Sequence, residues 1–133
     1  SANDLYQLAY CQAKLNQHSK AAENYRMVAA MEPQTFNAQF GLGRSLSKLG
    51  RHDEAIEALD VAVELQPENE IAVFNLAFAY QKAERFEDAI DTYLEASDLK
   101  ETARSYTNIA ICYQNLGDKD SADEYYTKAN DLK

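Results

Sequence analysis

The stretch GRHDEAIEALDVAVELQP, from Gly50 to Pro67, contains a complete helix together with both of its boundaries. A glycine precedes the helix, carboxylates occupy its first turn and a proline follows it, as is typical of helix ends. Its apolar residues recur three and four positions apart, which predicts an amphipathic helix over Asp53–Leu65. The apolar face is narrow and rich in alanine, so we expect another helix to pack closely against it.

The same pattern recurs along the whole chain. Related segments cover 16–33, 84–101 and 117–133, and their shared alanines, Ala21, Ala55, Ala89 and Ala122, are spaced by 34, 34 and 33 residues. The segments 5–15, 39–49, 73–83 and 106–116 recur in the same register upstream. This repetition predicts an all-α chain of about eight helices, arranged as helix-turn-helix units over 2–35, 36–69, 70–102 and 103–133.

Small and large residues occupy fixed positions in each unit. The first helix carries an aliphatic residue followed by a small one, at Leu8-Ala9, Leu42-Gly43, Leu76-Ala77 and Ile109-Ala110. The second helix carries the shared alanine and, four residues later, a bulky residue, at Tyr25, Leu59, Tyr93 and Tyr126. Small residues let two helix axes approach closely, and large neighbours fill the flanks. Between the helices, Asn16, Gly50 and Gly117 suit a left-handed turn position, which Glu84 occupies at a higher cost.

This pattern of leucine, small residue, tyrosine, alanine, aromatic residue, alanine and proline at a 34-residue period resembles the tetratricopeptide repeat family. The resemblance covers 1–133 and implies a single array of four repeats that forms an α-solenoid, a right-handed superhelix with a concave groove lined by the first helices. Pentatricopeptide repeats have a similar period and bind single-stranded RNA. The acidic charge and the proline-terminated units argue against that alternative.

Composition narrows the classes of function. The formal net charge of −9 argues against nucleic acid and anionic membranes as partners. The sequence has no apolar run long enough to cross a membrane, and two cysteines fit a reducing, cytoplasmic compartment. Because the chain begins at Ser1, we expect it to come from a longer protein, with the array ending near Lys133, where Asp123 and Asn130 make the last helix more polar.

The functional prediction is a protein-interaction module that binds a peptide or helix of a partner. The stripe of the first helices expected to face the groove combines aromatic, aliphatic and cationic side chains and has no carboxylate. Lys14, Lys48 and Lys82 lie near one rim. The predicted partner-binding residues are Tyr6, Tyr10, Phe40, Arg44, Ile71, Phe74, Asn75, Phe78, Arg104, Asn108 and Ile111.

The resemblance also bears on how a partner would bind. Some family members hold a peptide carboxylate with a lysine–asparagine clamp, but Tyr6 and Tyr10 occupy those positions here. Asn75 and Asn108 match the asparagines that bind a peptide backbone in the family. The groove is closer to those that take an apolar segment, as the type III secretion chaperones do. A self-assembling scaffold or spacer joined through the terminal repeats is the structural alternative.

No residue pattern indicates catalysis, a cofactor or a metal. The sequence has no phosphate-binding loop and no arrangement of nucleophile, base and acid. His18 and His52 share one turn position in different repeats and have no third ligand, so a packing role is expected. Cys11 and Cys112 share a position that takes Ser45 and Ala79 elsewhere, which predicts a small buried residue.

Overall fold

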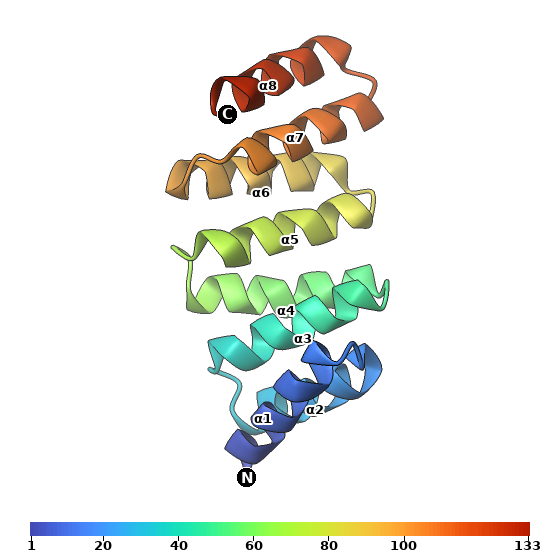
Figure 1. Ribbon diagram of the computed structural model, residues 1–133, viewed down its shortest axis with the longest axis vertical. Coiled ribbons are helices and arrows are strands. Elements are labelled where there is room, and N and C mark those ends of the chain that lie inside the picture. The colour runs from blue at the N-terminus through green and yellow to red at the C-terminus, as the bar shows by residue number, and fades with distance from the viewer. The chain divides into compact units, whose positions relative to one another are not determined.

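The computed structural model describes residues 1–133 and contains eight helices and no strand (Figure 1). The helices are α1 (Ala2–Lys14), α2 (His18–Met31), α3 (Phe36–Lys48), α4 (His52–Leu65), α5 (Glu70–Lys82), α6 (Phe86–Leu99), α7 (Ala103–Asn115) and α8 (Lys119–Asp131). The all-α prediction is confirmed, and each predicted repeat contains one pair of helices. None of the helices combines the length and the apolar character that crossing a bilayer requires.

The helices form two compact units, Ser1–Pro67 with α1 to α4 and Glu68–Lys133 with α5 to α8. Within each unit, every helix packs on the next one along the chain (Figure 1). The second helix of a repeat therefore packs on its own first helix and also on the first helix of the following repeat, as α2 does with α1 and α3. That all four repeats form a single array stays a prediction.

The core lies along the seams predicted from the repeated small residues. Ala21, Ala55, Ala89 and Ala122 are all buried. Gly43 shows why the first helix needs a small residue, since a Cβ atom added there would lie 2.5 Å from Leu59 Cγ. At that distance no methyl group fits without a shift of the leucine, so the approach of α3 to α4 depends on this glycine.

Two residues of the first repeat depart from the predicted burial. Leu8 and Cys11 are exposed, whereas their counterparts Leu42 and Ser45 in α3 are buried. The cause is the position of α1, which packs on α2 and over a small area on α3. The counterparts lie on α3, which packs extensively on both α2 and α4. The prediction of a buried cysteine is therefore wrong for Cys11 and confirmed for Cys112.

The turns inside the repeats share one geometry. After each first helix, a residue with positive φ stops the helix, at Asn16 (62°), Gly50 (77°), Glu84 (62°) and Gly117 (80°). The next residue donates its backbone N–H to a carbonyl five residues earlier, as Arg85 does to Tyr80 at 2.9 Å. This is the hydrogen bond of a Schellman motif, in which the left-handed position favours glycine. The prediction that Glu84 occupies the strained position is confirmed.

Replacing Glu84 should therefore change stability in a predictable direction. We expect Glu84→Gly to stabilise unit 2 by about 0.5–1 kcal/mol, because glycine escapes the left-handed penalty of about 1–2 kcal/mol but loses more entropy on folding. Gly117→Ala is the converse variant, and it should destabilise by about 1 kcal/mol. No atom lies within 4 Å of a Cβ added at Gly117, so only the backbone conformation is tested there. Urea denaturation measures both, and equal midpoints for all three proteins would contradict the prediction.

Candidate partner-binding surfaces

Four of the predicted binding residues come together in unit 1. The Tyr6 ring stacks on Tyr10 with centroids 6.5 Å apart and contacts the edge of the buried Tyr25 at 5.7 Å. On α3, the Arg44 guanidinium lies over the Phe40 ring, 5.6 Å from its centroid. All of these side chains line one cavity of about 390 Å³. Unit 1 thus has a concave site with aromatic walls.

The other seven predicted residues lie on α5 and α7 of unit 2. The rings of Phe74 and Phe78 stack with centroids 6.5 Å apart, and the Lys82 ammonium lies 5.2 Å from the Phe78 centroid. Ile71 is 55% exposed. Phe74 differs from Phe78, because it also contacts the fully buried Tyr93 at 5.4 Å and packs against the core of unit 2. Phe74 therefore has a structural role, while Ile71 is exposed and Phe78 is half-buried without a contact to Tyr93.

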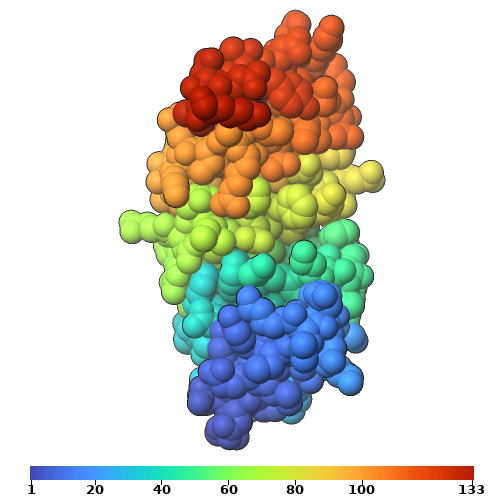
Figure 2. Space-filling model, viewed as in Figure 1, coloured from blue at the N-terminus to red at the C-terminus, as the bar shows by residue number.

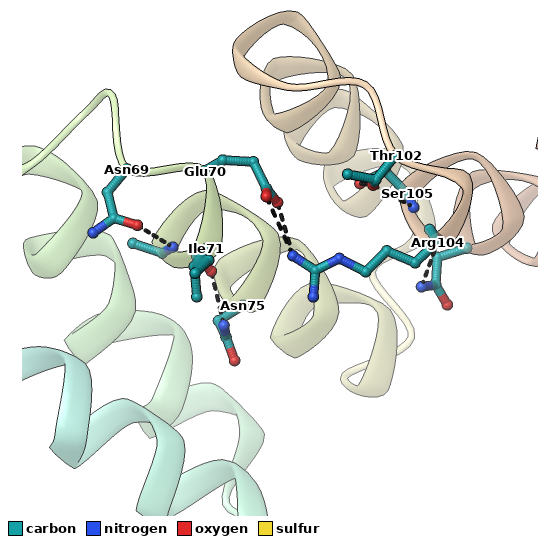
Figure 3. Close-up of polar contacts among 9 residues, drawn as sticks. Asn69, Glu70, Ile71, Asn75, Thr102, Arg104 and Ser105 are labelled. Carbon is teal, nitrogen blue, oxygen red and sulfur yellow. Dashed lines mark hydrogen bonds and ion pairs between the residues drawn. The ribbon is translucent and has the colours of Figure 1, made fainter. Parts of the chain in front are cut away.

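Arg104 is held in place by a carboxylate that the sequence pattern did not include. Its guanidinium forms an ion pair with Glu70 at 3.1 Å (Figure 3). The same group lies over the Phe74 ring, 4.0 Å from its centroid. The Glu70 side chain is only 11% exposed, so this pair is better shielded from water than an ordinary surface pair. The expectation that this surface carries no carboxylate is therefore wrong beside Arg104, whose charge is balanced within the chain.

The asparagines expected to bind a peptide backbone are bonded to their own helices. Asn75 Nδ2 donates to the Ile71 carbonyl at 2.7 Å (Figure 3). Asn108 Nδ2 donates to the Arg104 carbonyl at 3.0 Å. Asn115 makes the same contact with the carbonyl of Ile111, at 2.9 Å. One of the two amide hydrogens is used in each case, and the side-chain oxygen and the other hydrogen keep their bonding capacity.

The sequence pattern missed two residues that shape the cavity of unit 1. The repeat pattern predicts Tyr25 only as a core residue and assigns no role to Gly41. A Cβ atom added at Gly41 would lie 2.5 Å from Tyr25 Cζ, so this glycine makes room for the ring. Burial raises the pKa of Tyr25 to about 12 and keeps its hydroxyl protonated at neutral pH. Gly41 occupies the repeat position that holds Asn75 and Asn108 in unit 2. This difference in size is the sequence signal that indicates the site.

The second helices present a different surface. Their carboxylates are solvated or paired with nearby arginines, as Glu54 is with Arg51 at 2.6 Å and with Arg26 at 3.3 Å. The hydrogen bond from Arg51 is the main reason why the pKa of Glu54 is lowered. Arg85 and Asp88 form a similar pair at 3.0 Å. These pairs lie at helix starts on exposed surface, so they contribute little to stability.

Taken together, the paired antiparallel helices, the small-residue seams and the shared turns define a helical-repeat protein. Two sequence profiles described as tetratricopeptide repeat match residues 6–70 and 69–132. The chain therefore belongs to the tetratricopeptide repeat family. Membership of this family, whose repeats are typically non-catalytic interaction modules, supports a protein-interaction or scaffold module with protein partners.

Comparison with solved structures supports the same fold. The structure of MamA 41-end from Desulfovibrio magneticus RS-1 superposes with a TM-score of 0.94 at 26% identity, covering 99% of this chain and 75% of that one. MamA of MSR-1 gives a TM-score of 0.94 at 24% identity, over 99% and 76% of the two chains. At such low identity the likeness to MamA of MSR-1 concerns the fold alone. No curated protein matches the sequence.

The different surroundings of Phe74 and Phe78 lead to different expected losses of stability. We expect Phe74→Ala to destabilise unit 2 by about 2 kcal/mol, because it removes ring contacts with Tyr93 and with the Arg104 guanidinium. Phe78→Ala should cost less than about 1 kcal/mol, since Phe78 lies outside the core cluster. Denaturation midpoints of the two variants measure this difference, and equal losses would show that both rings play the same structural role.

Proposed function

We propose that the first helices of the repeats bind an apolar segment of a protein partner, and that the chain is a non-catalytic adaptor or scaffold. The observation that carries this proposal is the contrast between the two kinds of helix. The second helices carry many exposed carboxylates, whereas α5 combines the exposed Ile71 and the half-buried Phe78 with the Lys82 ammonium. Exposed apolar and aromatic side chains bordered by cations are typical of interfaces with protein partners.

The polar groups of this surface suit the backbone of a bound segment. The side-chain oxygens of Asn75 and Asn108 accept no hydrogen bond within the chain, and each amide keeps a free hydrogen. Such an amide can both donate to and accept from an extended strand. Apolar anchors would then supply most of the affinity, and the asparagines would fix the register of the segment.

The test removes the exposed Ile71 and the half-buried Phe78, neither of which belongs to the core cluster of unit 2. The double variant Ile71→Ser, Phe78→Ala should lower the affinity for the partner by about tenfold or more, because anchors of this kind contribute about 1–2 kcal/mol each. Wild-type and variant proteins are immobilised, exposed to an extract of the source cells, and compared by quantitative mass spectrometry of the retained proteins. A protein retained by the wild type and lost with the variant is then measured directly by calorimetry.

The matched control is Leu99→Ser, Leu132→Ser, which removes one exposed leucine at the end of α6 and one directly after α8. This variant should retain the partner at the wild-type level. Retention of the partner by the Ile71, Phe78 variant, with both variants folded by circular dichroism, would rule out α5 as the binding surface.

A structural role through self-association is the second candidate, favoured by exposed leucines in the first repeat. Leu8 is 48% exposed and Leu15 is 68% exposed, and Figure 2 shows the surface of α1 (dark blue) uncovered in that view. If these leucines join two chains, sedimentation velocity should show a concentration-dependent dimer that Leu8→Glu abolishes. A wild-type chain that sediments as a monomer at all concentrations would remove this candidate.

A further inference from the structure

The cavity of unit 1 has a cationic rim that is not neutralised within the chain. It is lined by residues of α1, α2 and α3, and Lys14, Arg44 and Lys48 are among them. No carboxylate lines the cavity, and none of these three cations forms an ion pair. In a chain with a net charge of −9, three unpaired cations around one concavity form a local site that is complementary to an anion.

The buried Tyr25 also lines this cavity, and its hydroxyl has no hydrogen-bond partner in the chain. Only 3% of Tyr25 is exposed. The equivalent hydroxyls are bonded, since Tyr93 donates to Gln81 at 2.5 Å and Tyr126 donates to Gln114 at 2.9 Å. Each acceptor lies twelve residues before its tyrosine, and the residue in that position before Tyr25 is Ala13. Tyr25 therefore presents an unused donor at a cavity that Ala13 also lines.

The hydroxyl opens onto the cavity and is not sealed from solvent, so an acceptor from outside the chain can replace water there and bond to it directly. The surrounding cations favour an acceptor that carries a negative charge. The same cations and the aromatic walls formed by Tyr6, Tyr10 and Phe40 suit a side chain with an apolar stem. The hydroxyl donor, the positive charge and the aromatic walls therefore all favour a ligand that has a carboxylate on an apolar stem.

Unit 2 provides an internal comparison, because Ala21 aligns with Ala89 and Ala55 with Ala122. The positions of Ala13, Asn37 and Gly41 in unit 1 are filled in unit 2 by the larger residues Gln81, Arg104 and Asn108. Gln81 bonds to the tyrosine, and Arg104 covers Phe74. The cavity of unit 1 is therefore bordered by three residues that are smaller than their counterparts in unit 2.

Unit 1 also carries more positive charge than unit 2 at the equivalent positions. The positions of Arg44 and Lys48 hold the uncharged Ile111 and Asn115 in unit 2. Space, an unused hydroxyl and positive charge therefore occur together in unit 1. The repeat framework alone does not require this combination.

We propose that the cavity of unit 1 binds a carboxylate side chain of the partner segment, with an apolar residue of that segment beside it. The carboxylate accepts a hydrogen bond from Tyr25 and pairs with Arg44, while Lys14 and Lys48 add long-range attraction. The inference rests on the proposed function, because it names the chemistry of the partner segment at one of the proposed surfaces.

The probe is the peptide acetyl-Leu-Glu-Phe-amide, and its neutral counterpart carries glutamine in place of glutamate. Both are titrated into the ¹⁵N-labelled 133-residue chain while the Gly41 amide signal is followed. We expect the glutamate peptide to bind about tenfold more tightly than the glutamine peptide, which corresponds to about 1.4 kcal/mol. Acetate and inorganic phosphate are titrated separately, and both should shift Gly41 only at far higher concentration.

Three variants test the parts of the site. Ala13→Gln gives Tyr25 the partner that Tyr93 has, so it should abolish the glutamate preference while preserving or raising stability. Tyr25→Phe removes the donor, and Arg44→Ile introduces the residue found in unit 2, so both should reduce the preference. Arg26→Ile is the control, because it removes the same charge from the exposed surface of α2, where Arg26 pairs with Glu54.

Equal binding of the two peptides would overturn the proposal, as would an unchanged preference in Ala13→Gln. Binding of phosphate or acetate as tight as that of the glutamate peptide would also overturn it, since the cavity would then be a general anion site. Failure here leaves the proposed function intact if the Ile71, Phe78 variant still loses the partner. If that variant retains the partner while the glutamate preference holds, only the α5 surface is ruled out.

Discussion

Close contact between a small residue on one helix and a bulky residue on the next is the constraint on which the rest of the structure depends. Gly43 against Leu59 is one instance in unit 1, where even one added carbon atom would collide with the leucine. The seams fix which face of each helix is inside and therefore which faces remain for other uses. On the second helices that remaining face carries solvated carboxylates, and on the first helices it carries aromatic, aliphatic and cationic side chains.

The fold could be predicted almost completely from the sequence, because the pattern of small and bulky residues recurs in four repeats with nearly constant spacing. A single amphipathic stretch such as 50–67 is compatible with many folds, but its repetition with the same small and bulky positions leaves one arrangement of helix pairs. The left-handed position of Glu84 followed from the same register, since three other repeats have asparagine or glycine there. The errors, Leu8 and Cys11, concern a side of α1 that the repeat rule assigns to a preceding repeat.

The candidate binding residues could be named from helical periodicity, but their partners could not. Periodicity places Arg104 on the surface-facing stripe, yet Glu70 reaches it from another helix 34 residues earlier. The cavity of unit 1 is harder to predict from the sequence, because it depends on small side chains from several helices that leave space between them. Ala13 and Gly41 look unremarkable in their own helices, and their combined effect is seen only where α1, α2 and α3 meet around Tyr25.

The two units therefore use one framework to present different chemistry. In unit 2 the single arginine of the surface is balanced by Glu70 and covers Phe74, so apolar anchors dominate what is left exposed. In unit 1 the cations are unpaired and surround an unused hydroxyl. Apolar burial contributes affinity with little discrimination among partners. A group of cations discriminates more strongly, because a neutral ligand leaves them without a counter-charge. On this division of roles, unit 2 would supply affinity and unit 1 would select which segment is held.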